Sequence, residues 1–263
     1  MATFLSHEIR NSITYYWDLI RELVRRDLKV QYEGTLLGFA WTLIMPFLNL
    51  GIFYFLFKII LDIQIRRFTS FAFVGIIAYN WFQSGLSGAA LSTTGNRELV
   101  LRPRFPAFIL PVVAVSSSML HFIFTFPLIL LIVFFEGHHL PVAICLLPVV
   151  MGVQFILTIG LGYIATILNT IFRDTKPILD VLLRLFFFLS PVFYDPNMVP
   201  EPYQWLYNLN PLVVILQSYR DIILNGIMPP WFDLGMVAIF SLATAWIGFR
   251  IFQYQSYRFL EDL

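Results

Sequence analysis

Six long apolar stretches dominate the chain, and almost no charged residue falls inside any of them. They cover 36–61, 71–93, 108–135, 141–170, 178–194 and 231–252, the fifth being the shortest. A membrane hydrocarbon core about 30 Å thick needs about 20 apolar residues per helix. The buried core of a soluble protein accounts for one or two such runs, not six. The pattern therefore predicts an all-α membrane protein with six transmembrane helices.

Little of the chain remains outside these stretches. Hydrophobic residues make up 59% of its 263 residues and charged residues 13%. We therefore expect a single transmembrane domain over 1–263, with a cytoplasmic interface helix at 10–33 and a six-helix bundle at 36–252. The first apolar run starts too late, and is too long, for a cleaved signal peptide. The net charge of +1 gives no overall field that would attract nucleic acid.

The positions of the basic residues predict the orientation. An even number of spans places both ends of the chain on one side, and most of the 17 Lys and Arg residues fall on that side. Because basic loops stay in the cytoplasm, we expect both termini there. The residues on this side are Arg10, Arg21, Arg25, Arg26, Lys29, Arg97, Arg102, Arg104, Arg173, Lys176, Arg250 and Arg258. Lys58, Arg66, Arg67 and Arg220 fall on the other side.

An amphipathic helix is expected before the first span, at 16–29. Apolar side chains such as Trp17 and Val24 recur on one face, while Glu22, Arg25 and Lys29 lie opposite. Such a helix lies along a membrane surface. Its polar face either only anchors the chain or docks a cytoplasmic partner.

The loop at 95–107 joins the second and third spans. It combines Arg97, Glu98, Arg102 and Arg104 with two prolines that stiffen it. A short helix here would present charge to a partner; the alternative is a solvated loop whose arginines only set the topology.

Small residues interrupt the apolar spans at helical spacing. They are Gly34 and Gly38, then Ser84, Gly85, Ser87 and Gly88, then Gly160 and Gly162. Small residues let helix backbones approach closely in membranes, so we expect packing surfaces. We expect the only cysteine, Cys145, to be a small core residue.

A run of helical pattern too short to cross a membrane follows the fifth span. It covers 212–224, with Pro211 suited to its first turn and Gly226 to its end. We expect a re-entrant or interfacial helix on the outer side.

The chain shows no sign of catalytic chemistry. It has no G-x-x-x-x-G-K-[ST] phosphate-binding loop, so ATP is not bound by that route. The pair His138–His139 beside Glu136 is too small a ligand set to favour a metal site, and no spacing suggests a catalytic nucleophile. Acidic residues are nearly absent from the spans, which argues against a proton-coupled transporter. We expect no enzyme activity, no catalytic residue, no metal and no cofactor in this chain.

Arg184 is the one charge well inside a predicted span. It either pairs with Asp180 one turn away or serves as a cation in a pathway for a polar or phosphate-bearing substrate. Aromatic residues such as Trp41, Phe187 and Tyr194 either face lipid or form a surface on which sugar rings stack.

Three segments resemble the type-2 ABC exporter permeases that export polysaccharide. The residues at 27–46 (DLKVQYEGTLLGFAWTLIMP) are similar to the family's opening motif. Those at 190–194 (SPVFY), and those from Asn210-Pro211 to Tyr219-Arg220, are similar to its later motifs. The resemblance covers essentially the whole chain and is strongest to the O-antigen export permeases, which are related to capsule and teichoic-acid permeases.

The resemblance implies a homodimer in the bacterial inner membrane, with a separate pair of ATPase subunits that bind ATP and magnesium. It implies a pore between the protomers that is lined chiefly by the first and fifth spans. The substrate that the resemblance implies for this pore is polysaccharide linked through diphosphate to a polyprenyl lipid. By position, 16–29 is the interface helix, 97–104 couples to the ATPase and 212–224 helps to gate the outer exit.

These expectations assign two sets of residues. The predicted substrate pathway contains Trp41, Arg184, Phe187 and Tyr194, and the predicted coupling residues are Arg25, Arg26, Arg97, Glu98, Arg102 and Arg104. The rival functions are a type-2 permease for a drug or lipid and, more distantly, a channel that needs no ATPase.

Overall fold

The computed structural model describes residues 2–33, 37–60, 68–136 and 141–255, and all regular structure there is helical. The prediction of an all-α protein is confirmed. The α-helices are α1 (Ala2–Tyr32), α2 (Trp41–Phe53), α3 (Phe68–Gly95), α4 (Arg97–Val100), α5 (Ile109–Phe135), α6 (Leu147–Ile171), α7 (Thr175–Leu189), α8 (Glu201–Asn208), α9 (Pro211–Arg220) and α10 (Trp231–Gln255). Short 3₁₀ or π segments are η1 (Gly38–Ala40), η2 (Tyr54–Ile60), η3 (Val142–Leu146), η4 (Pro196–Met198) and η5 (Asp221–Asn225).

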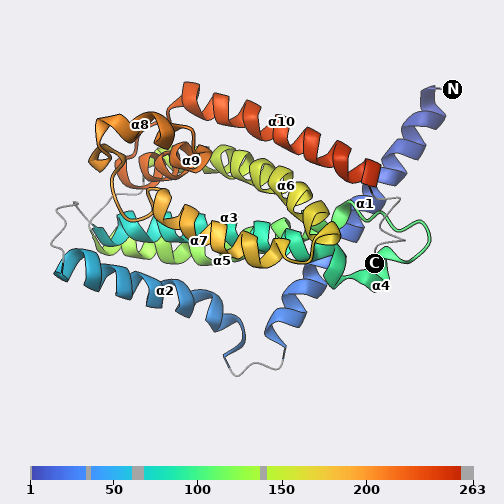
Figure 1. Cartoon of the computed structure of the whole chain (residues 1–263), viewed down its shortest axis with the longest axis horizontal. Coiled ribbons are helices and arrows are strands. Elements are labelled where there is room, and N and C mark those ends of the chain that lie inside the picture. The colour runs from blue at the N-terminus through green and yellow to red at the C-terminus, as the bar shows by residue number, and fades with distance from the viewer. Residues whose placement is uncertain (1, 34–36, 61–67, 137–140, 256–263) are drawn as a thin grey trace.

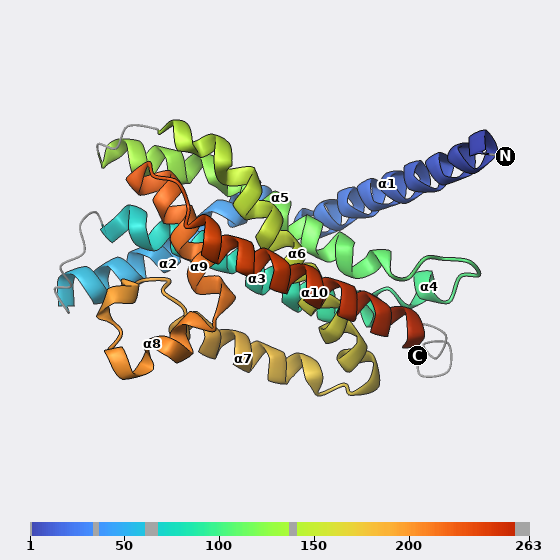
Figure 2. The same cartoon turned by 90° about the horizontal axis from the view of Figure 1, so that it is seen from above.

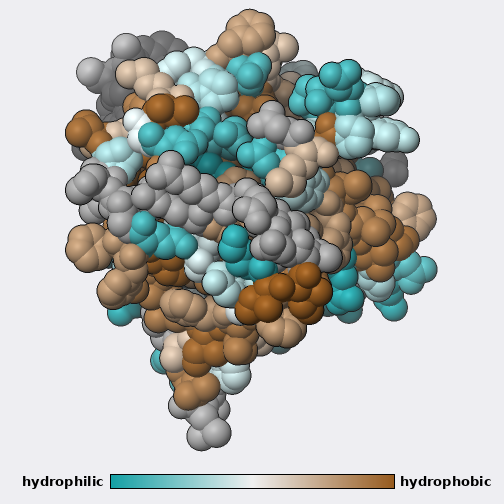
Figure 3. Space-filling model, turned by 90° about the vertical axis from the view of Figure 1, so that its left-hand side faces the viewer, coloured by the Kyte–Doolittle hydropathy of each residue, from teal (hydrophilic) through white to brown (hydrophobic). Residues whose placement is uncertain are grey.

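Helix α3 is the central element of the bundle. It packs against α5 and α6, and α10 packs on the far side of α6 (Figure 1). Helices α2 and α7 flank α3, while α1 crosses α5 and extends beyond the bundle (Figure 2). Helices α8 and α9 gather at one end of the bundle, and α4 lies at the other, where α10 ends. Figure 3 looks onto the α8–α9 end, where hydrophilic and hydrophobic side chains are interspersed.

Four stretches of helix among the described residues are long and apolar enough to cross a membrane. They are Trp41–Ile60, Ile109–Phe135, Val142–Ile171 and Trp231–Gln255, and they correspond to the first, third, fourth and sixth predicted spans. Helix α3 has 28 residues and takes the place of the second span, while α7 has only 15. Six spans therefore stay a prediction.

The fifth stretch ends earlier than its hydropathy suggested. The pattern extended it to Tyr194, but α7 ends at Leu189, and Ser190 is extended with ψ 150°. The cause is Pro191, because a residue that precedes proline is disfavoured in the helical conformation. Tyr194 consequently lies in the connection beyond α7.

Close helix packing accounts for three of the predicted small residues. A Cβ added to Gly160 would lie 2.6 Å from the backbone nitrogen of Ala245, so α6 and α10 touch backbone to backbone there. A Cβ on Gly85 would lie 2.8 Å from Ser118 Oγ, and one on Gly162 would lie 2.9 Å from Ala89 Cβ.

Two other small residues do not pack as predicted. In the described part of the chain, a Cβ added to Gly38 would meet no atom within 4 Å; its φ of +49° shows that a turn before α2 requires it. Its partner Gly34 lies outside the described residues. Cys145 is exposed in η3 rather than buried in a core, because the chain enters α6 through this 3₁₀ turn.

The helix predicted at 212–224 is confirmed, together with both of its boundaries. Asn210 accepts a hydrogen bond through Oδ1 from the backbone nitrogen of Leu212 at 3.0 Å, and Pro211 occupies the first turn. The segment continues through η5 and ends at Gly226, whose φ is +68°. Its re-entrant position in a membrane stays a prediction.

Arg220, at the end of α9, was expected to be one of the basic residues of the outer side, and the structure shows a different role. The side chain is only 1% exposed. Its guanidinium lies 3.5 Å from the centre of the Phe71 ring, and Nη2 donates to the backbone oxygen of Val192 at 2.8 Å. Arg220 thus joins α9 to the start of α3 and to the connection after α7.

Gly160→Ala should destabilise the bundle because the added methyl group must push α10 away from α6. Overpacking of this kind costs about 1–3 kcal/mol. The measurement is the melting temperature of the detergent-purified protein. Gly152→Ala in the same helix is the control, since a Cβ there meets no atom within 4 Å. Equal melting temperatures for the two variants would contradict the close α6–α10 contact.

Candidate functional site

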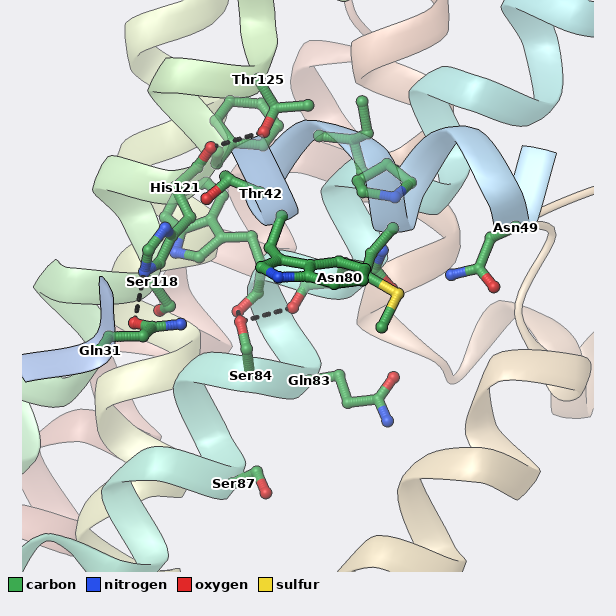
Figure 4. A pocket seen from close by; sticks show the side chains of 16 residues that line it. Gln31, Thr42, Asn49, Asn80, Gln83, Ser84, Ser87, Ser118, His121 and Thr125 are labelled. Atoms are coloured by element: carbon green, nitrogen blue, oxygen red, sulfur yellow. Dashed lines mark hydrogen bonds between the residues drawn. The ribbon is translucent and has the colours of Figure 1, made fainter. Parts of the chain in front are cut away.

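A polar pocket of about 590 Å³ lies beside α3, between α2 and α5 (Figure 4). Its lining contains amide and hydroxyl side chains and one imidazole: Gln31, Thr42, Asn49, Asn80, Gln83, Ser84, Ser87, Ser118, His121 and Thr125. Apolar and aromatic side chains make up the rest of the lining: Trp41, Met45, Pro46, Ile77, Trp81 and Phe122. No carboxylate, lysine or arginine is among the described residues that line it. Such a surface offers many hydrogen bonds and no net charge.

The polar side chains of α3 form a stripe along the helix. Asn80, Gln83, Ser84 and Ser87 recur at three- and four-residue spacing, which places them on one face of a helix. The hydroxyl of Ser84 donates to the backbone oxygen of Asn80 at 2.6 Å. Sequence reasoning treated Ser84 and Ser87 as packing residues and missed both amides. The signal was present, since amides at helical spacing are expensive inside an apolar run.

A second pocket, of about 230 Å³, continues the first toward α7. The two pockets share Asn49, Asn80 and Gln83, and the second adds Arg184 and Phe187, among others. Together they form one recess along α3, which we call the groove. Trp41, Arg184 and Phe187, three of the four predicted pathway residues, line this one groove, and their role in a pathway stays a prediction.

Tyr194, the fourth predicted pathway residue, does not line the groove. Its hydroxyl donates to the backbone oxygen of Phe188 at 3.2 Å, and its ring lies 6.2 Å from that of Tyr207. It belongs to the connection at the α8–α9 end, because α7 has already ended at Leu189.

Asp180 has a different partner from the one considered in the sequence. Lys176 Nζ donates to its two carboxylate oxygens at 2.7 and 2.6 Å, and Ser87 Oγ donates to it at 3.1 Å. These contacts tie α7 to the polar stripe of α3. The described residues show no salt bridge between Asp180 and Arg184, whose side chain is exposed. A charged side chain in a span faces water or the bundle interior, so the predicted span at α7 would direct Arg184 to the groove that it lines.

The predicted coupling residues gather at the opposite end, where α4 lies. Arg26 Nη2 donates to Asn96 Oδ1 at 2.7 Å and to Asp27 Oδ1 at 2.9 Å, which joins α1 to the α3–α4 corner. Val24 and Val100 are buried together in the apolar cluster beneath. We call the resulting surface the charged patch; its exposed members are Arg25, Arg26, Arg97, Glu98, Arg102 and Arg104.

Comparison with known proteins gives a family match over most of the chain. The sequence profile described as "ABC-2 type transporter" matches residues 18–224. This range begins in α1 and extends through α9 into η5, so it includes the groove and the charged patch.

Curated relatives match over nearly their full length. The chain is 32% identical over 250 residues to the O-antigen export system permease protein RfbA of Myxococcus xanthus, covering 94% of this chain and 96% of that protein. It is 29% identical over 260 residues to RfbA of Klebsiella pneumoniae, covering 98% and 100%. It is 25% identical over 242 residues to the polysialic acid transport protein KpsM of Escherichia coli, covering 89% and 92%.

A thiol introduced at Arg184 should react with a water-soluble alkylating reagent, because the groove admits water. A Cys145→Ala background removes the native cysteine. In membranes, Arg184→Cys should be labelled at least about tenfold faster than Leu182→Cys, since the reactive thiolate forms in water and not in lipid. Leu182 is the matched control because it is exposed on the opposite face of α7. Equal rates would show that Arg184 does not face a wet groove.

Proposed function

Because the chain belongs to the ABC-2 type transporter family, we propose that it is the membrane-spanning subunit of a polysaccharide exporter. Its substrate is an O-antigen-like polysaccharide linked through diphosphate to a polyprenyl lipid, and it crosses the inner membrane. Full-length similarity to the O-antigen export permeases supports this assignment. The structural observation that supports it is the groove, in which amide and hydroxyl side chains and the cation Arg184 line a recess of an otherwise apolar bundle.

The chemistry of the groove suits a sugar chain. Amides and hydroxyls can exchange hydrogen bonds with successive sugars, and the rings of Trp41 and Phe187 offer flat faces for stacking. Arg184 supplies a cation for the diphosphate, since guanidinium pairs well with phosphate oxygens. A pathway for a lipid or an apolar drug would leave the amides of Asn80 and Gln83 without partners, which is costly.

The assembly that completes the pathway is a homodimer. Helices α2 and α7 line the groove and also expose large apolar side chains, Phe47 and Leu48 on α2 and Leu185 on α7 among them. Two protomers that meet along α2 and α7 would join their grooves into one pore. The exposed Arg184 would then be enclosed by the partner subunit instead of by lipid.

ATP hydrolysis takes place in a separate pair of ATPase subunits, because an ABC transporter couples transport to ATP and this chain carries no phosphate-binding loop. Those subunits would hold ATP and magnesium, and they dock on the charged patch. The patch and both chain termini consequently face the cytoplasm. Helix α9 and Tyr194 lie toward the outer exit.

The decisive genetic test is deletion of the gene. The deletion strain should lose its surface polysaccharide and accumulate the lipid-linked form inside the cell, and a plasmid copy should restore export. Susceptibility to toxic lipids and drugs is measured in parallel, because a drug permease would change susceptibility and leave surface polysaccharide intact. Normal surface polysaccharide in the deletion strain would overturn the proposal.

Charge reversal in the patch should weaken docking of the ATPase. Arg97→Glu or Arg102→Glu replaces attraction with repulsion, and a cost of about 2 kcal/mol corresponds to a roughly thirtyfold weaker complex. The measurement is the amount of ATPase that co-purifies with the permease, together with export. Arg250→Glu, also exposed and near the same end, is the matched control. If the reversed variants retain the ATPase as the control does, the patch arginines serve only to set the topology.

A further inference from the structure

Helix α7 carries three charged side chains at four-residue spacing: Lys176, Asp180 and Arg184. This spacing places them in order along one face of the helix, with neighbouring Cβ atoms about 5–6 Å apart. The carboxylate of Asp180 therefore has a cation within reach on either side. Its choice of partner decides which cation is neutralised, and one of the two, Arg184, lines the groove.

In the structure the carboxylate of Asp180 is held by Lys176. Lys176 Nζ donates to both carboxylate oxygens, at 2.7 and 2.6 Å, and the hydroxyl of Ser87 on α3 donates to one of them at 3.1 Å. The lysine side chain is only 20% exposed, so the pair is partly shielded from water. Among the described residues, no salt bridge links Asp180 to Arg184.

The order of the charges along α7 makes this choice of partner informative. On a helix, an acidic residue four positions before a basic one forms the more favourable pair, and the reverse order is weaker. Asp180 precedes Arg184 and follows Lys176, so the helix alone would favour the pair with Arg184. The hydrogen bond from Ser87 comes from a different helix, α3, and it fixes the carboxylate beside Lys176.

The pair between Lys176 and Asp180 leaves the guanidinium of Arg184 without a salt bridge in the described part of the chain. The described residues that line the pocket of about 230 Å³ beside Arg184 include no carboxylate. Without Lys176, the unpaired carboxylate of Asp180 would lie one turn away, and opposite charges within a span pair with one another. That pair would occupy the guanidinium that a diphosphate needs.

We infer that Lys176 is a positioning residue for the proposed transport. By holding Asp180, it keeps the guanidinium of Arg184 available to the diphosphate of the lipid-linked substrate. The inference rests on the proposed function, in which Arg184 supplies the cation for that diphosphate. The ammonium group of Lys176 acts through Asp180 and does not itself contact the substrate.

The test measures how tightly farnesyl diphosphate, a short polyprenyl diphosphate, binds to the permease–ATPase complex in lipid nanodiscs. Isothermal titration calorimetry gives the affinity, with the heat from empty nanodiscs subtracted. Lys176→Met should weaken binding by about tenfold or more, because the freed Asp180 pairs with Arg184. Lys176→Arg should bind as the unmodified complex does, since arginine also holds a carboxylate. Arg184→Gln should bind weakly whether or not Lys176 is present.

Removal of the carboxylate separates this role of Lys176 from two others. Asp180→Asn should bind at least as tightly as the unmodified complex, and Lys176→Met/Asp180→Asn should restore the affinity, because neither variant has a carboxylate to pair with Arg184. If the ion pair only stabilised the fold, Asp180→Asn would be as harmful as Lys176→Met. If Lys176 bound the diphosphate directly, the double variant would stay weak. Either result would overturn the inference, as would unchanged affinity in Lys176→Met.

Failure of this inference can be told apart from failure of the proposed function. No binding of farnesyl diphosphate to the unmodified complex, or unchanged binding in Arg184→Gln, would overturn the inference, because Arg184 would not be the cation for the diphosphate. If deletion of the gene nevertheless removes surface polysaccharide, the export function stands and only the charge arrangement on α7 is refuted. If deletion leaves surface polysaccharide intact, the proposed function fails whatever the affinities are.

Discussion

A charge placed in hydrocarbon must be paired, surrounded by polar groups or turned toward water, and the arrangement of this chain follows from that constraint. Arg220 is surrounded: carbonyl oxygens and the Phe71 ring enclose its guanidinium. Asp180 is paired, since Lys176 neutralises it and Ser87 adds a hydrogen bond. Among the described residues Arg184 forms no salt bridge, and its exposed side chain lines the groove. The predicted position of α7 in the membrane would therefore require water or polar groups beside α3 at this point.

Helix α3 connects the proposed machinery of the protein. One of its faces packs against α5 and α6, and the other carries the polar stripe of the groove. Its first turns contact Arg220 and so hold α9, while its last turn leads to Asn96, which binds Arg26 of α1. A movement of α1 and α4 under the ATPase would thus act directly on the helix that lines the groove.

Local patterns could be read from the sequence, and long-range partners could not. Apolar length located the long helices, although it extended the fifth beyond the end of α7 at Leu189. The sequence from Pro211 to Gly226 predicted a helix and both of its ends, because capping depends on neighbouring residues. Sequence spacing made Arg184, four residues after Asp180, a candidate partner of that carboxylate. In the structure Lys176, four residues before Asp180, forms the salt bridge instead. The burial of Arg220 depends on Phe71 and Val192, which are distant in sequence and could not be paired with it. The polar stripe at Asn80 and Gln83 could be read from the sequence, but the groove around it depends on how α2 and α7 pack beside α3, which the sequence does not give.

The central claim is that the polysaccharide passes along the groove, and contact between the two can be measured directly. A photoreactive amino acid is incorporated at Gln83, in the groove, and separately at Phe240, exposed on α10. After irradiation of intact exporting cells, the purified permease is examined for attached glycan with an antiserum against the surface polysaccharide. The account predicts glycan attached at Gln83 and none at Phe240. Absence of glycan at Gln83, or equal attachment at both positions, would contradict it.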